Sequence, residues 1–231
     1  MTLSLGHIVN LSIIELFNKF FTKLMHLEGI EETVEEFKLD NVAHFVDFLR
    51  KLYIQLNPQK GGECKTITPP SMTELHHVAV KFRVASSKNL FDINFNDGII
   101  EIPKLTISDE IELTIQNLLA FEQCHCEDNY LNDYVVIMDR LASIPKDVDL
   151  LVKHGIVENR LGDSGKGPNL INKLADGVIV DLKNFYFAGI YEDLNVHCRT
   201  SCIEEFMAGC HLRFILASYK LTEAVMQFTI S

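Results

Sequence analysis

The chain has 231 residues, of which 47% are hydrophobic and 23% are charged. This length and composition are those of an ordinary globular protein with a sizeable core, and they exclude wholesale disorder. The formal net charge of −11 repels phosphate backbones, so no nucleic-acid partner is expected. Six cysteines occur without a signal-peptide pattern at Met1, which predicts free thiols in a reducing compartment.

Two amphipathic helices are expected at the start of the chain. Apolar residues recur at helical spacing from Ile8 to Leu27 and again from Asn41 to Leu56. Residues 57–70 follow, and glycine and proline punctuate them strongly. We therefore expect an N-terminal helical segment over residues 1–56 and a linker or long loop over 57–70.

A small antiparallel β element is expected next. Ser71 begins a capping-box pattern for a short helix, and residues 78–84 and 91–95 then alternate between apolar and polar side chains. The sequence Asn96-Asp97-Gly98 is a strong hairpin turn signal before a return strand over 99–105. Pro103 lies within that return strand and indicates an edge or a bulge there.

The remainder of the chain predicts helices. Ser108 is typical of an N-cap, and the helix after it should bury Ile111, Ile115, Leu118 and Leu119 and continue to about Phe121. We expect Phe121 to anchor this helix in the core, with Cys124 packed beside it. Further helices are expected over 131–142, 146–153 and from 169 to the end, with a loop over 162–168.

These elements favour a mainly α fold, a helical bundle-like assembly with one small antiparallel β hairpin or sheet element. Residues 71–231 would form the β element and the helices that follow it, either as a separate unit or as one domain with residues 1–56. No internal repeat is visible in the sequence.

Several short motifs, in the right order, resemble one plant family of unknown function, called DUF247 or UPF0481. The best match is Asn117-Leu-Leu-Ala-Phe-Glu-Gln-Cys124, close to the family's "NLIAFEQC". Others are His44-Phe-Val-Asp-Phe-Leu-Arg50, the segments beginning at Ser71 and Leu90, Gly98-Ile-Ile-Glu-Ile-Pro103, and Gly155-Ile-Val-Glu-Asn-Arg-Leu-Gly162. Together with blocks at 134–139 and 147–151, they cover most of residues 41–162.

The resemblance implies a membrane-associated plant protein without enzymatic activity. Some family members act as self-recognition determinants in grass pollen incompatibility, which implies a protein partner and protein–protein contact rather than turnover. Family members carry a long stretch before the equivalent of Ile8, so a partial member lacking its N-terminal part is expected here. The two alternatives are an unrecognised enzyme and a non-functional fragment.

The family also ends in a membrane-spanning helix, and the C-terminal segment Leu212–Ser231 departs from that pattern. Lys220 and Glu223 interrupt it, and each costs about 2.5–3.5 kcal/mol at a bilayer centre on insertion scales. The longest apolar run falls short of the roughly 20 residues that a span needs. We expect a buried or interfacial amphipathic helix there, with the chain on the cytosolic face of a membrane or in the cytoplasm.

Five constellations could in principle carry chemistry, and each has a plainer interpretation. The loop Gly162-Asp-Ser-Gly-Lys-Gly-Pro168 lacks the spacing of a phosphate-binding loop and the flanks of a serine-protease site. The others are a zinc set, a nucleophile pair, a histidine pair and an acidic cluster. The zinc set comprises Cys124, His125, Cys126, His197, Cys198, Cys202, Cys210 and His211. The nucleophile pair is Cys124 with His197, and the histidine pair is His76 with His77. The acidic cluster comprises Asp92, Asp97, Glu101 and Asp109.

Each of these four sets is better explained by burial, capping or turn formation. Buried cysteine is common, Cys-x-Cys is too short for a good zinc bite, and no oxyanion-hole glycine pattern accompanies Cys124. We therefore expect no catalytic residue, no cofactor site and no metal site.

The segment Leu212–Ser231 should not span a bilayer. Expressed in plant cells, the chain should be soluble from the start or should be released from membranes by alkaline carbonate, because Lys220 and Glu223 oppose insertion. A chain that stays in the carbonate-resistant pellet and yields only to detergent would show that the segment spans after all.

Overall fold

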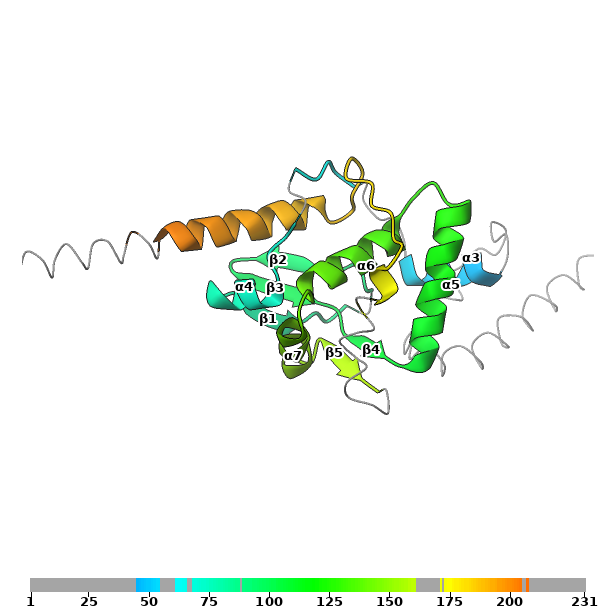
Figure 1. The fold of residues 1–231 in the computed structure, drawn as a ribbon, viewed down its shortest axis with the longest axis horizontal. Coiled ribbons are helices and arrows are strands. Elements are labelled where there is room, and N and C mark those ends of the chain that lie inside the picture. Colours follow the sequence, from blue (N-terminus) through cyan, green and yellow to red (C-terminus); the bar gives the residue numbers. More distant parts are fainter. Residues whose placement is uncertain are drawn as a thin grey trace, which may run out of the picture.

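A computed structural model describes residues 45–54, 61–65, 68–87, 89–160, 171, 173–204 and 207. The predicted helix over 8–27, the loop over 162–168 and the C-terminal segment 212–231 lie outside these residues. About half of the structure is helical, with helices arranged around two small β-sheets (Figure 1). Within the described part of the chain, no helix has both the length and the apolar character that crossing a membrane requires.

The predicted hairpin is present. Strand β2 (Asn94–Asn96) pairs antiparallel with β3 (Ile99–Ile102) across a two-residue turn. Asp97 and Gly98 in that turn both have positive φ, 48° and 71°, as a type I′ turn requires. This backbone twist matches that of the strands, so the two-residue loop fixes the register.

The first sheet is mixed rather than antiparallel. Strand β1 (Lys81–Val84) pairs parallel with β3, with Phe82 opposite Ile100, and the strand order is β1-β3-β2. The expectation of a purely antiparallel element is therefore wrong. Because β3 is the central strand and its Ile100 and Ile102 are fully buried, it forms the middle of the core.

A second, two-stranded sheet was not expected. Pro103 and Lys104 end β3, and the chain resumes as β4 (Leu105–Ile107), which pairs parallel with β5 (Val157–Asn159). The predicted return strand over 99–105 is thus two strands in two sheets. Proline lacks the N–H that a ladder needs, which explains why pairing stops there.

Three helices connect β4 to β5: α5 (Asp109–His125), α6 (Tyr130–Leu141) and α7 (Pro145–Lys153). The predicted caps of two helices are confirmed. Ser108 Oγ accepts the Ile111 N–H, and Ser71 and Glu74 form a complete capping box on α4 (Met72–His77). The Ser71 and Ser108 hydroxyls each accept an N–H group that a helix start leaves without an intrahelical partner.

Two further segments complete the described body. Helix α3 (Phe45–Ile54) packs beside α5. A helix over residues 188–204 and 207, here called the C-terminal helix, passes over β2, where His197 lies against Phe95, and projects beyond the body (Figure 1). Its connection to the body runs through 182–185, where Gly62 and Phe185 exchange two backbone hydrogen bonds of 3.0 and 2.9 Å. A Cβ on Gly61 would lie 2.8 Å from backbone carbons of Asn184 and Phe185, so only glycine fits this approach.

Candidate functional site

The most highly bonded polar group among the described residues is the carboxylate of Glu122, in the middle of the motif that ends at Cys124. Helix α5 buries Ile111, Ile115, Leu118 and Leu119, as predicted from their spacing. Glu122 lies eleven residues after Ile111, on the same side of a 3.6-residue helix, and its exposed fraction is 0%. The apolar stripe of the helix therefore ends in a buried charge.

The Glu122 carboxylate caps the start of a different helix. Its Oε2 accepts the backbone N–H groups of Leu131 and Asn132, both at 2.9 Å, and its Oε1 lies 3.1 Å from the Leu131 N. Asn129, the N-cap of α6, makes no capping bond with its own side chain. Glu122 supplies that bond from α5, and its negative charge suits the positive end of the α6 dipole.

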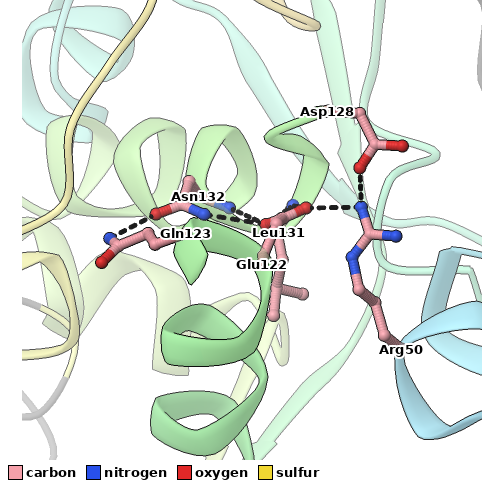
Figure 2. Close-up of polar contacts among 6 residues, drawn as sticks. All are labelled: Arg50, Glu122, Gln123, Asp128, Leu131 and Asn132. Carbon is pink, nitrogen blue, oxygen red and sulfur yellow. Dashed lines mark hydrogen bonds and ion pairs between the residues drawn. The ribbon is translucent and has the colours of Figure 1, made fainter. Parts of the chain in front are cut away.

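Side chains from three directions complete the network around Glu122 (Figure 2). Arg50 of α3 donates from Nη2 to Glu122 Oε1 at 2.8 Å and also pairs with Asp128 in the loop between α5 and α6. Asn132 Nδ2 donates to Glu122 Oε2 at 2.8 Å, and Gln123 Nε2 donates to Asn132 Oδ1 at 2.8 Å. The network therefore joins α3, α5, α6 and their loop.

Two other buried carboxylates make comparable cross-ties. Asp147 of α7 accepts the Thr73 N–H of α4 at 2.6 Å and the Ile144 N–H at the start of its own helix at 2.9 Å. Asp133 of α6 accepts the Tyr186 N–H at 2.8 Å, which fixes the segment before the C-terminal helix. Each carboxylate is at most 2% exposed and binds a backbone group remote in sequence.

Asp133 is the least compensated of the three. Its Oδ1 has no hydrogen-bond partner within the described residues, and no cation lies among the groups that shift it. Burial raises the pKa of Asp133 to about 7, with the Tyr186 N–H opposing the shift and the Glu122 and Asp181 carboxylates adding to it. Asp133 therefore titrates near neutral pH.

These groups hold elements together, and their geometry does not resemble an acid–base pair open to a substrate. Glu122 already accepts from Arg50, Leu131 and Asn132, so it has little capacity left to act as a base. Burial raises the pKa of the Cys126 and Cys198 thiols, which lowers their thiolate fraction at neutral pH. The described residues include no group of three or more His, Cys, Asp or Glu that could hold a metal ion.

The structure does not bring together Cys124 and His197, the nucleophile pair that the sequence analysis considered and set aside. Cys124 is exposed near the end of α5, whereas His197 on the C-terminal helix packs edge-on against Phe95, with ring centroids 5.3 Å apart. Helix α5 and the C-terminal helix lie on opposite sides of the body (Figure 1). The same separation divides the described members of the possible zinc set; Cys210 and His211 lie outside the described residues.

The remaining candidates have structural roles where they are described. Asp97 occupies the hairpin turn, Asp92 accepts the Ser87 hydroxyl, and Glu101 lies on the central strand. His76 and His77 form the last turn of α4, where His76 lies against Phe82. The side chain of Asp109 is outside the described residues. Five cysteines are described and none of them forms a disulfide: Cys64, Cys124, Cys126, Cys198 and Cys202.

The predicted role of Phe121 is wrong. Phe121 is only partly buried and stacks on His125 at a centroid distance of 4.9 Å, and Cys124 is exposed. At 100° per residue, position 121 turns about 80° away from Ile111, whereas position 122 lies within about 20° of it. The helix therefore places Glu122 in the core and leaves Phe121 at its margin.

The sequence does contain one signal for the buried Glu122. An acidic residue in phase with four buried apolar positions needs a partner, because a lone buried charge is very costly. Arg50 lies in the resembling motif upstream, yet its pairing with Glu122 over 72 residues is invisible in one sequence. Asn132 carries no local signal for this role.

The comparison with protein families decides the relationship. A family model described as a plant protein of unknown function, DUF247, matches residues 5–230. The chain belongs to the DUF247 family. A UPF0481 protein of Arabidopsis thaliana is 24% identical over 143 residues, which are 61% of this chain and 27% of that relative. This chain thus matches about a quarter of that DUF247-type relative, and no solved structure matches it.

Glu122→Gln should destabilise the fold strongly. The amide removes the charge that pairs with Arg50 and turns an N–H donor toward groups that already donate, so the free energy of unfolding should fall by about 3–5 kcal/mol. Arg50→Met should also destabilise strongly, because it leaves the buried Glu122 carboxylate without its cation. Urea unfolding monitored by circular dichroism measures both.

Glu112→Gln on the same helix is the matched control. Glu112 pairs with Lys173, whose side chain is 62% exposed, so its loss should stay below about 1 kcal/mol. Equal losses for the Glu122 and Glu112 variants would contradict the assigned role of the buried network.

Asp133 should make stability depend on pH between about 4 and 7. Its pKa is higher in the folded chain, so the unfolded chain loses this proton first, and stability falls as pH rises through that window. A shift of roughly three units corresponds to a fall of about 4 kcal/mol. Asp133→Asn should remove that fall, giving a variant more stable than the parent at pH 8.

Denaturant titrations at several pH values test this difference. The exposed Glu158, whose pKa is lowered to about 2 by Arg160 and Lys104, acts below about pH 4.5 and so outside the window. Parallel stability curves for the parent and Asp133→Asn from pH 4 to 8 would exclude the assignment.

Proposed function

We propose that the chain is a non-enzymatic protein-interaction component, of the self-recognition kind, that works at a membrane. The observation that carries this proposal is a row of exposed apolar side chains on the C-terminal helix. Val196, Ile203 and Met207 are 57%, 63% and 61% exposed. Such a row costs free energy in water, and contiguous exposed apolar surface is typical of interaction sites.

The bonding of the buried carboxylates also supports a binding role over catalytic turnover. The buried carboxylates of Glu122, Asp133 and Asp147 all accept backbone N–H groups from other elements, which makes them parts of the scaffold. The enzyme alternative depends on Cys124 or the acidic cluster, and neither belongs to a group of three or more His, Cys, Asp or Glu among the described residues that could hold a metal ion. Membrane association rests on the family resemblance together with the apolar residues of the segment 212–231.

The proposal predicts a complex that depends on the row. Tagged chain expressed in plant cells should elute in size-exclusion chromatography of detergent extracts as a species larger than the free chain. Ile203→Glu should return it to the size of the free chain, because it places a charge on the exposed row. This substitution leaves the buried core untouched.

Leu113→Glu is the matched control. Leu113 on α5 is also 63% exposed, and it lies on a different element, so this variant should keep the larger species. If the parent, Ile203→Glu and Leu113→Glu all elute as the free chain, the proposed function is wrong.

A further inference from the structure

The C-terminal helix has two apolar sides. Ala188, Tyr191 and Leu194 are at most 4% exposed and face the core, and Cys198 packs against the same cluster. Val196, Ile203 and Met207 point elsewhere. At 100° per residue these three fall within about 40° of one another and lie roughly opposite Tyr191, Leu194 and Cys198. One side of the helix binds the body, and the other has no partner among the described residues.

The outer side has the spacing of a coiled-coil seam. Val196, Thr200, Ile203 and Met207 follow one another at intervals of four, three and four residues, which are d, a, d and a positions of a heptad repeat. In the sequence the same intervals continue through uncharged residues to the end of the chain: Cys210, Phe214, Ala217, Leu221, Ala224 and Phe228. Lys220 and Glu223, the charges that oppose a membrane span, both fall off this seam.

The charges beside the seam favour one partner and one orientation. Arg199 occupies a g position, and Glu204 occupies the e position five residues later; both are exposed. In a parallel pair of identical helices, g of one copy faces the following e of the other, so Arg199 would meet Glu204 twice. In an antiparallel pair the g row faces the g row of the other copy, so Arg199 and Glu204 would not meet.

We infer that the outer side of the C-terminal helix, residues 196–207, pairs with the same side of a second copy of this chain in a parallel two-stranded coiled coil. This inference names the partner of the proposed interaction site and therefore rests on the proposed function. The core-facing side stays with its own body, so each copy keeps its fold. The pairing covers the exposed Val196, Ile203 and Met207 at once.

Sedimentation velocity of the purified full chain at about 0.15 M salt tests the inference. The parent should be a dimer at tens of micromolar and dissociate on dilution. Ile203→Glu should be a monomer, and Leu113→Glu should remain a dimer, because Leu113 is equally exposed but lies on α5. A monomeric parent, or a dimeric Ile203→Glu variant, would overturn the inference.

A charge exchange tests both the register and the orientation. Arg199→Glu and Glu204→Arg should each weaken the dimer about tenfold, since each turns two attractive pairs into two repulsive ones. The double variant should restore the dissociation constant of the parent to within about twofold. Single and double variants that weaken additively would exclude parallel pairing in this register.

The two proposals fail in different ways. A purified chain that is monomeric, but whose large species in cells still depends on Ile203, would retain the interaction function and replace the second copy with another protein. A monomer with no Ile203-dependent species in cells would remove both.

Discussion

A carboxylate at the end of the apolar stripe of α5 determines how the helical part of this protein is assembled. Glu122 satisfies the first N–H groups of α6, which have no intrahelical acceptor, and it does so from a helix nine or ten residues earlier in the chain. The angle between α5 and α6 therefore follows from one capping interaction. Arg50 then brings α3 to the same point, so one carboxylate joins three helices.

The same device recurs at Asp147 and Asp133 with fewer hydrogen-bond donors. Glu122 has a cation, two backbone donors and a side-chain amide; Asp147 has two backbone donors; Asp133 has one donor and a buried oxygen without a described partner. Burying a charge is costly unless hydrogen bonds replace the lost water. The weakest of these ties, Asp133 to Tyr186, is also the one next to the C-terminal helix.

That placement links the scaffold to the proposed function. Segment 182–185, held by Gly62 and followed by the Asp133 tie at Tyr186, sets the direction in which the C-terminal helix leaves the body. The inner side of the helix is committed to the core through Tyr191 and Leu194. An outer side of apolar residues at heptad spacing is then presented in a fixed orientation, as a recognition surface requires.

Local signals in the sequence predicted local structure well. The Ser71 capping box, the Ser108 cap, the Asn96-Asp97-Gly98 turn and the buried side of α5 each depend on residues within a few positions of one another. Strand pairing between segments far apart in the sequence was not predicted. The parallel partner of β1, the strand β5 and the second sheet depend on contacts between segments far apart, which no propensity encodes.

The error at Phe121 has the same origin. A large aromatic residue inside a motif looks like a core anchor, whereas helix phase decides burial, and the phase selects Glu122. The sequence did not predict the Glu122 network, because the role of a buried acid can be inferred only when its partners are known. Arg50, Leu131 and Asn132 are the partners, and only three-dimensional structure brings Arg50 to them.

Native-state hydrogen exchange of the Leu131 and Asn132 amides tests the central role of Glu122 most directly. These are first-turn amides of α6, which ordinarily exchange quickly because no helical carbonyl protects them. The account predicts protection comparable to that of the Ile137 amide in the middle of α6, with that protection lost at Leu131 and Asn132 in Glu122→Gln under conditions where the variant is still folded. Exchange at Leu131 and Asn132 as fast as in exposed loops of the parent protein would contradict it.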